Sequence, residues 1–173
     1  NDSMDDGTST KRRILLLTTV RSYRLEAFRA AAERLDVDIT TGLDLPEVLT
    51  EQWPDALPLS FADTSEAARR IVEYAYHNPL SAIVSVDDSG SLVAAAASNL
   101  LGLPHNNPAA AQAARNKALM RRMLAAGGVA VPWFREYSTA DDPTAVVAEA
   151  PYPCVIKPLN LNGSRGVMRA DNP

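Results

Sequence analysis

The fold is decided by residues 153–169, which read PCVIKPLNLNGSRGVMR. A short apolar run ends at Lys157, a polar segment with two glycines follows, and a second apolar run closes the stretch. This order predicts a strand, a flexible turn and a strand, with a cation where the first strand ends. Glycines let backbone N–H groups approach a ligand closely, and consecutive N–H groups form a concave site for anions. Because Lys157 adds a compact positive charge that suits phosphate, the stretch is a candidate phosphate-binding loop.

The composition is that of a soluble globular protein. The 173 residues are enough for one domain, or for a small domain plus part of another. Hydrophobic residues make up 46% of the chain and charged residues 22%, which is an ordinary balance. A net charge of −4 without a lysine–arginine block argues against nucleic acid as the main partner. No apolar run approaches the roughly 20 residues that span a bilayer, so no membrane partner is expected.

The few cysteines and histidines indicate a reducing compartment, and their positions do not predict a zinc site. The single cysteine, Cys154, has no partner for an internal disulfide, which favours a cytoplasmic location. The two histidines lie far from Cys154 in the sequence and form no zinc-binding pattern with it.

Apolar runs alternate with amphipathic segments along residues 13–101. Runs rich in leucine, isoleucine and valine predict strands over residues 13–18, 37–41, 57–61 and 82–86. Apolar residues at helical spacing predict helices around residues 25–35, 45–51, 65–76 and 87–101. This alternation predicts an α/β fold with a Rossmann-like, doubly wound parallel sheet. Ligands of such sheets bind at the carboxyl ends of the strands, here residues 18–24 and 87–90.

Polar residues at these strand ends have structural interpretations that we favour over functional ones. Ser22 is the expected cap of the first helix, and Asp88 and Ser89 of the helix that Gly102 ends. A substrate contact by Asp88 and Ser89 is the less favoured alternative. Three residues, Arg21, Tyr23 and Arg24, are predicted to be surface residues rather than a carboxylate clamp. His105 is interpreted as a loop residue rather than a catalyst.

Two common nucleotide-binding classes are disfavoured by the motifs. The first strand is not followed by Gly-x-Gly-x-x-Gly, and no Gly-x4-Gly-Lys-Ser/Thr occurs anywhere in the chain. A dinucleotide-dependent dehydrogenase and a P-loop enzyme both depend on such glycine loops.

A second helix-rich segment precedes the loop. Asn107 and Pro108 predict the start of a helix that runs to Ala126 and stops at Gly127. Its apolar stripe comprises Ala113, Ala114, Met120 and Leu124. Lys117 lies on this stripe, where a lysine must either reach water with its ammonium group or find a partner. A strand over residues 129–137, a helix from Asp142 to Glu149 and a strand over 152–157 are expected to follow.

Two lysines forty residues apart, one on a helix and one ending a strand before a glycine loop, resemble the ATP-grasp superfamily. The blocks that carry the resemblance are 114–117 with Met120, 127–132, 152–158 and 162–167, in the family's order and spacing. Residues 100–104 are similar to the domain that precedes ATP-grasp in carboxylate-amine ligases. The likeness covers nearly all of residues 13–172.

The resemblance implies roles for particular residues. Lys117 and Lys157 would approach the phosphates of ATP. A flap over the triphosphate would consist of Asn162, Gly163, Ser164, Arg165 and Gly166. Within it, Ser164 would offer its hydroxyl and backbone N–H, Gly163 and Gly166 would act as hinges, and Arg165 would either contact phosphate or be solvated. The family joins a small carboxylate to an amine through an acyl phosphate, with ATP and Mg²⁺.

The resemblance also implies a division of the chain. We expect a disordered tail over residues 1–10, a pre-ATP-grasp domain over 11–108 and a truncated first ATP-grasp subdomain over 109–173. The family's second lobe, with the acidic Mg²⁺ ligands, is not among the 173 residues. We therefore expect an enzyme fragment that is inactive alone and contains no assigned catalytic or metal residue. Its last strand, 167–170, is expected to fray or to pair in a homodimer.

Two functions of other classes stay open. One is a non-catalytic module that binds a small anion or a protein partner. The other is a structural fragment that dimerises through its last strand.

Overall fold

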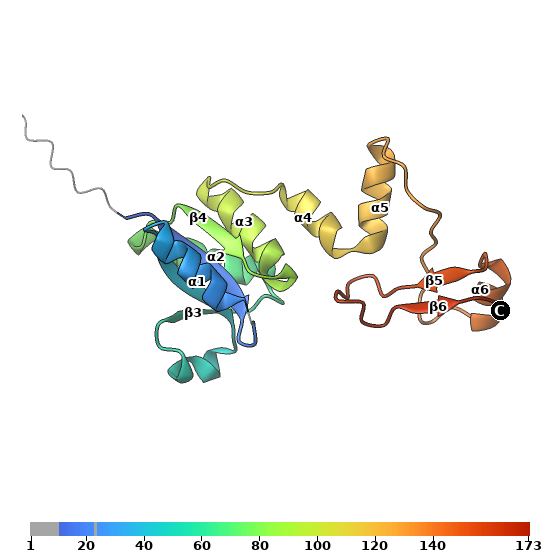
Figure 1. The fold of residues 1–173 in the computed structure, drawn as a ribbon, viewed down its shortest axis with the longest axis horizontal. Coiled ribbons are helices and arrows are strands. Elements are labelled where there is room, and N and C mark those ends of the chain that lie inside the picture. Colours follow the sequence, from blue (N-terminus) through green and yellow to red (C-terminus); the bar gives the residue numbers. More distant parts are fainter. Residues whose placement is uncertain (1–10, 23) are drawn as a thin grey trace, which may run out of the picture. The chain divides into compact units, whose positions relative to one another are not determined.

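Strand β1 (Arg13–Thr19) is the centre of a four-stranded parallel sheet (Figure 1). The computed structural model describes residues 11–22 and 24–173, so the tail predicted over 1–10 and the surface position predicted for Tyr23 lie outside the described residues. The sheet has the order β3-β2-β1-β4, with β2 (Asp38–Asp44), β3 (Ala56–Leu59) and β4 (Ala82–Ser85). All neighbouring strands are parallel. The predicted α/β fold with a parallel sheet is confirmed.

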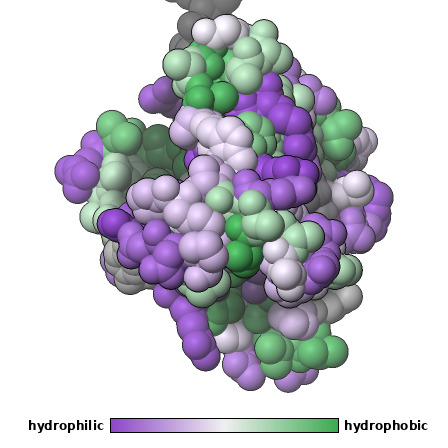
Figure 2. Space-filling model, turned by 90° about the vertical axis from the view of Figure 1, so that its right-hand side faces the viewer, coloured by the Kyte–Doolittle hydropathy of each residue, from purple (hydrophilic) through white to green (hydrophobic). Residues whose placement is uncertain are grey.

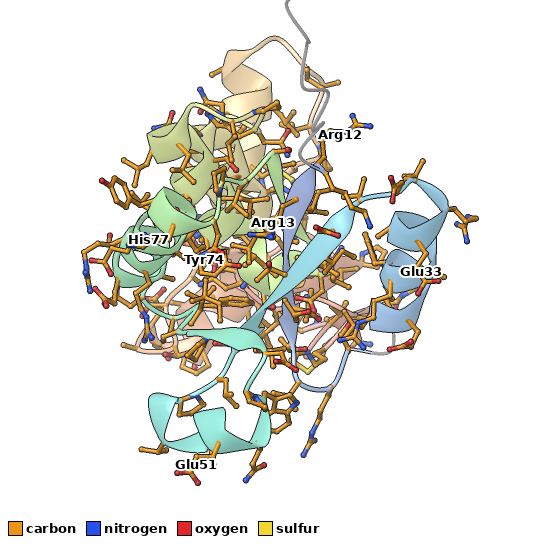
Figure 3. All side chains as sticks on the ribbon, turned by 90° about the vertical axis from the view of Figure 1, so that its left-hand side faces the viewer. Arg12, Arg13, Glu33, Glu51, Tyr74 and His77 are labelled. Carbon is orange, nitrogen blue, oxygen red and sulfur yellow. The ribbon has the colours of Figure 1, made fainter. Side chains whose placement is uncertain are left out.

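Strand β1 lies in the core because it is apolar on both faces. Leu15, Leu16 and Leu17 of β1 are each at most 1% exposed, as expected for a strand with neighbours on both sides and packing on both faces. Helices α2 (Thr64–His77) and α3 (Ser91–Leu101) bury small and branched residues in the core that contains Leu15 and Leu17. Figure 3 shows α1 with Glu33 and α2 with Tyr74 and His77 on opposite sides of the sheet.

Helix α1 (Leu25–Arg34) is packed more loosely than the sequence predicts. Its apolar residues Leu25 and Phe28 are half-buried, and Leu35 is 69% exposed at the helix end. The predicted cap at Ser22 is wrong, because Arg24 is the N-cap residue of this helix and makes no side-chain cap hydrogen bond. Two 3-10 helices, η1 (Glu47–Gln52) and η2 (Asp88–Gly90), complete this part of the chain.

The chain divides into two compact units, residues 1–108 and 109–173. The second unit contains α5 (Lys117–Ala126), α6 (Pro143–Glu149) and an antiparallel hairpin of β5 (Cys154–Ile156) and β6 (Met168–Ala170). Helix α4 (Pro108–Arg115) begins at the boundary. The predicted helix of residues 143–149 and the strand, turn and strand of the loop region are confirmed, and Asp142 caps α6 through Thr144 N at 3.0 Å.

Two predicted elements of the second unit are wrong. The helix expected from Pro108 to Ala126 is interrupted at Asn116, whose backbone is extended (φ −124°, ψ 112°). Its side chain caps α5 instead, so the predicted apolar stripe does not run past this residue. Residues 129–137 form no strand, because no strand among the described residues pairs with them. Several apolar side chains of this unit are exposed, among them Trp133 at 61% and Met168 at 58%.

The surface of the molecule is mixed in polarity. Figure 2 shows hydrophobic residues interspersed with hydrophilic ones on one face of the molecule. Within the part of the chain that the structure describes, no helix is long and apolar enough to cross a bilayer.

Gly42 in β2 provides a test of the packing beside β1. A Cβ atom at this position would lie 2.7 Å from Leu17 Cδ2 and 3.0 Å from Leu59 Cδ1, and both leucines are fully buried. We predict that Gly42→Ala lowers the free energy of unfolding by about 1–3 kcal/mol, because a packed core resists added volume. The measurement is urea unfolding.

The matched control is Gly127→Ala. Gly127 has φ −82°, and its added Cβ would meet nothing closer than 3.5 Å. This variant should be neutral or slightly stabilising. Equal unfolding midpoints for the Gly42→Ala variant and the wild type would contradict the packing described for β2.

Candidate functional site

Lys117 is the first residue of α5, and both of its nitrogen groups contact the distant loop. Its backbone N–H donates to Leu159 O at 3.2 Å. Its Nζ donates to Leu159 O at 3.3 Å and to Leu161 O at 2.5 Å. The first N–H groups of a helix have no partner within it, so the start of α5 leaves this donor available for the loop. The structure therefore joins two segments that lie more than forty residues apart in the sequence.

Asn116 makes this contact possible. Its Oδ1 accepts hydrogen bonds from Ala118 N and Leu119 N, both at 3.0 Å, which is the usual role of an N-cap residue. In a continuous helix the N–H of Lys117 would instead donate to a carbonyl four residues earlier. The break at Asn116 thus directs Lys117 toward the loop.

The loop over residues 158–167 has an unusual backbone. Gly163, Ser164 and Gly166 all have left-handed φ angles, of 60°, 57° and 67°. Two turn hydrogen bonds hold it, from Arg165 N to Asn162 O and from Val167 N to Ser164 O, each 3.3 Å. A left-handed angle at Ser164 is uncommon for a residue with a side chain. Turns of this kind can direct N–H groups toward one point, which suits an anion.

Gly166 is required for more than its backbone angle. A Cβ atom there would lie 2.8 Å from Pro158 Cγ. The two ends of the loop therefore pack directly on each other. At Gly163 an added Cβ would meet nothing within 4 Å, so the tip of the loop is open.

Arg165 and Lys157, the two other cationic residues of the predicted site, have different environments. Arg165 is bonded within the loop, from Nε to Asn162 O at 3.3 Å and from Nη2 to Asn162 Oδ1 at 2.9 Å. Lys157 follows β5 and is exposed, and it makes no hydrogen bond or ion pair with any residue that the structure describes. The structure thus brings Lys117 to the loop and leaves Lys157 with its ammonium group in solvent.

The first unit contains a separate hollow of about 660 Å³ at the carboxyl end of β4. Residues from the two predicted ligand-binding strand ends line it, among them Arg24, Asp87 and Asp88. One wall is a helical stripe of small residues on α3, comprising Ser91, Ala94, Ala95 and Ser98. Ser98 is 1% exposed and its Oγ has no hydrogen-bond partner among the described residues. A buried hydroxyl without a partner is costly, so this wall has an unused hydrogen-bonding group.

The cap at this hollow differs from the prediction. Asp87, not Asp88 or Ser89, caps the helical segment, because its Oδ1 accepts from Ser89 N at 3.0 Å and from the Ser89 hydroxyl. His105, predicted to be a loop residue, lies after α3 and its Nδ1 is 2.7 Å from Leu103 O. Gly102 ends α3 in the left-handed conformation, as predicted.

Metal binding finds no support among the described residues. No group of three histidine, cysteine, aspartate or glutamate side chains in residues 11–22 and 24–173 is arranged to hold a metal ion. Mg²⁺ is commonly held by one or two carboxylates together with substrate phosphates and water.

Comparison with known proteins agrees with the resemblance. Residues 28–105 match the family described as the ATP-grasp N-terminal domain. An L-amino acid ligase from Bacillus licheniformis has a crystal structure that superposes on 94% of this chain with a TM-score of 0.70 and 25% identity. Both findings support an ATP-grasp superfamily ligase fragment.

The two proteins to which this chain is similar are considerably longer than it. The chain covers 39% of the Bacillus ligase. The uncharacterized protein y4rH of Sinorhizobium fredii is 45% identical over 65 residues, which are 38% of this chain and 14% of that protein. The chain therefore spans less than half the length of either relative.

The sequence contains one local signal of the helix break before Lys117, which was not predicted. Asparagine is a poor residue inside a helix and a favoured one at its start. Asn116, directly before Lys117, is therefore a second helix start within the predicted helix. The contact of Lys117 with Leu161 left no such local signal.

Gly166 and Gly163 provide a paired test of the loop. Both Gly166→Ala and Gly163→Ala place a side chain at a left-handed φ, which costs roughly 1–2 kcal/mol. Only the alanine at position 166 also meets Pro158. We predict that Gly166→Ala shifts the amide NMR signals of Leu159 and Lys117, whereas Gly163→Ala changes signals near the loop tip alone. Equal shifts at Lys117 in both variants would refute the closed base of the loop.

Proposed function

We propose that the chain is part of an ATP-dependent ligase that activates a carboxylate as an acyl phosphate and joins it to an amine. In this proposal residues 11–108 form the pre-ATP-grasp domain and residues 109–173 the first ATP-grasp subdomain. The phosphates of ATP bind Lys117, Lys157 and the flap of Asn162, Gly163, Ser164, Arg165 and Gly166.

One observation supports the proposal most strongly: the ammonium group of Lys117 lies 2.5 Å from the carbonyl oxygen of Leu161, the residue directly before the flap. The two blocks that the resemblance assigns to phosphate binding are thus neighbours in the second unit. The left-handed residues of the flap add backbone N–H groups suited to an anion. The match of residues 28–105 to the ATP-grasp N-terminal domain supports the same assignment.

The proposed reaction depends more on neutralising the negative charge of the phosphates than on covalent catalysis by the protein. A carboxylate oxygen attacks the γ-phosphorus, the bond to the β–γ bridging oxygen breaks, and ADP leaves. The amine then attacks the acyl carbon, phosphate leaves, and the amine nitrogen loses a proton. In the first step negative charge gathers on the transferred group and on ADP, and lysines and loop N–H groups in fixed positions stabilise it. Mg²⁺, which the family uses, would neutralise further charge when bound.

The hollow of the first unit is the proposed place for the carboxylate substrate. It lies at the strand end where ligands of doubly wound sheets bind. Arg24, whose side chain is cationic, is among the residues that line it. Since the Bacillus neighbour is an L-amino acid ligase, amino acids are the first carboxylates to test.

A non-catalytic module that binds a small anion is the second candidate. The flap backbone and two lysines would suit such a role without any reaction. Turnover of ATP in the presence of an acid and an amine separates the ligase from this module.

Lys157→Met in the intact enzyme tests the assignment of phosphate binding. The variant keeps the apolar stem and loses the charge. We predict that it weakens binding of a non-hydrolysable ATP analogue about 10- to 100-fold, the range of one charge-assisted hydrogen bond. Acid-dependent ATP hydrolysis should fall at least as far. Calorimetric titration and a phosphate-release assay measure the two effects.

Arg169→Met is the matched control. Arg169 lies on the same hairpin and is 70% exposed, and its Nη2 pairs with Asp171 at 2.7 Å. Removing this charge should leave nucleotide affinity within about twofold, since exposed ion pairs contribute little. Equal losses in both variants would indicate a general charge effect, and unchanged affinity of the Lys157→Met variant would remove its proposed role.

A further inference from the structure

The chain has three lysines, at positions 11, 117 and 157, and their ammonium groups have three different environments. Lys11 forms ion pairs of 3.1 Å with Asp36 and Asp38, whose hydrogen bonds raise the pKa of its ammonium group. Lys157 is exposed without a partner among the described residues. Lys117 alone donates to backbone carbonyls, those of Leu159 and Leu161.

The environment of Lys117 leaves its charge without a counter-ion. Carbonyl oxygens accept hydrogen bonds but carry no net charge. No carboxylate among the described residues forms an ion pair with Lys117. Lys117 is half-buried, and two hydrogen bonds hold its ammonium group in one place, so it is a fixed positive charge. A phosphate oxygen is a stronger acceptor for it than either carbonyl.

We propose that Lys117 positions the loop of residues 158–167 when no nucleotide is bound, and that phosphate competes with the carbonyls of Leu159 and Leu161 for its ammonium group. The first statement concerns the chain without ligand. The second rests on the proposed function, because it requires phosphate to bind beside Lys117.

The contacts determine which part of the loop responds. The backbone N–H of Lys117 also holds Leu159, and this contact persists when the ammonium group leaves. Pro158 packs against Gly166 and keeps the base of the loop closed. Leu161, by contrast, has Lys117 Nζ as the partner that ties its carbonyl to α5. Transfer of the ammonium group to phosphate therefore releases residues 160–165, which contain the open tip at Gly163.

NMR of the lysine side chains in the ligand-free chain tests the first statement. With three lysines, 15N labelling of lysine gives three Nζ signals, which variants at each position assign. We expect slow hydrogen exchange at Lys117, because its ammonium protons are hydrogen-bonded, and fast exchange at the exposed Lys157. The Nζ signal of Lys11, which pairs with Asp36 and Asp38, shows whether the first unit is folded. Equally fast exchange at Lys117 and Lys157 would overturn the positioning role.

Tryptic cleavage after Arg165 measures the consequence for the loop. Lys117→Met removes the tether and adds no cleavage site, and we expect cleavage after Arg165 to become roughly tenfold faster, in line with loss of a hydrogen bond to a charged group. Lys11→Met is the matched control, since it also removes one lysine but lies in the first unit, and its rate of cleavage after Arg165 should equal that of the wild type. Cleavage of the Lys117→Met variant at the wild-type rate would also overturn the proposal.

Titration with inorganic triphosphate tests the second statement. In the wild type we expect the Lys117 Nζ signal to shift. We also expect cleavage after Arg165 to become faster, because the exchange releases residues 160–165. A shift at Lys157 alone would reject the exchange while leaving phosphate binding by the hairpin in place. No shift at either lysine would reject phosphate binding by this chain, and the exchange with it, while the ligand-free results would still decide the positioning role.

Discussion

The contact between Lys117 and the carbonyls of Leu159 and Leu161 is the constraint on which the second unit depends. This unit has few large buried side chains, and its hairpin has exposed apolar residues such as Ile156 and Met168. Hydrogen bonds therefore carry much of the connection between α5 and the loop. The connection exists because Asn116 ends one helix and caps the next, which leaves the N–H and the ammonium group of Lys117 free to reach the loop.

The first unit is organised differently, by burial rather than by single polar contacts. Strand β1 supplies leucines that are almost fully buried, and α2 and α3 supply small residues that allow close packing. Other small residues on α3, among them Ser91, Ala95 and Ser98, line the hollow beside β4. One helix thus serves the core on one side and a candidate ligand site on the other.

The sequence predicts the first unit well because its signals are periodic. A run of leucines and a helical stripe such as Ala68, Ile71 and Ala75 reveal burial without any knowledge of the fold. The break at Asn116 was missed because apolar residues keep their helical spacing across it. Residues 129–137 have the composition of a strand, but a strand needs a neighbour, and pairing is not a local property. The cap at Asp87 was missed by one residue, since aspartates occupy both positions 87 and 88.

The residues of the site could be predicted from the sequence, but the contacts between them could not. The resemblance selected Lys117, Lys157 and the flap from motifs and their order. It did not indicate that Lys117 donates to loop carbonyls, because that contact joins residues 44 apart in the sequence. Nor did any motif indicate Ser98, whose buried hydroxyl is recognisable only once the neighbouring atoms are known.

A crystal structure of the intact protein with a non-hydrolysable ATP analogue tests the central claim most directly. The account predicts phosphate oxygens within hydrogen-bonding distance of Nζ of both Lys117 and Lys157, with the carbonyl of Leu161 no longer bonded to Lys117. A structure in which the phosphates lie elsewhere, with Lys117 still bonded to Leu161, would contradict it.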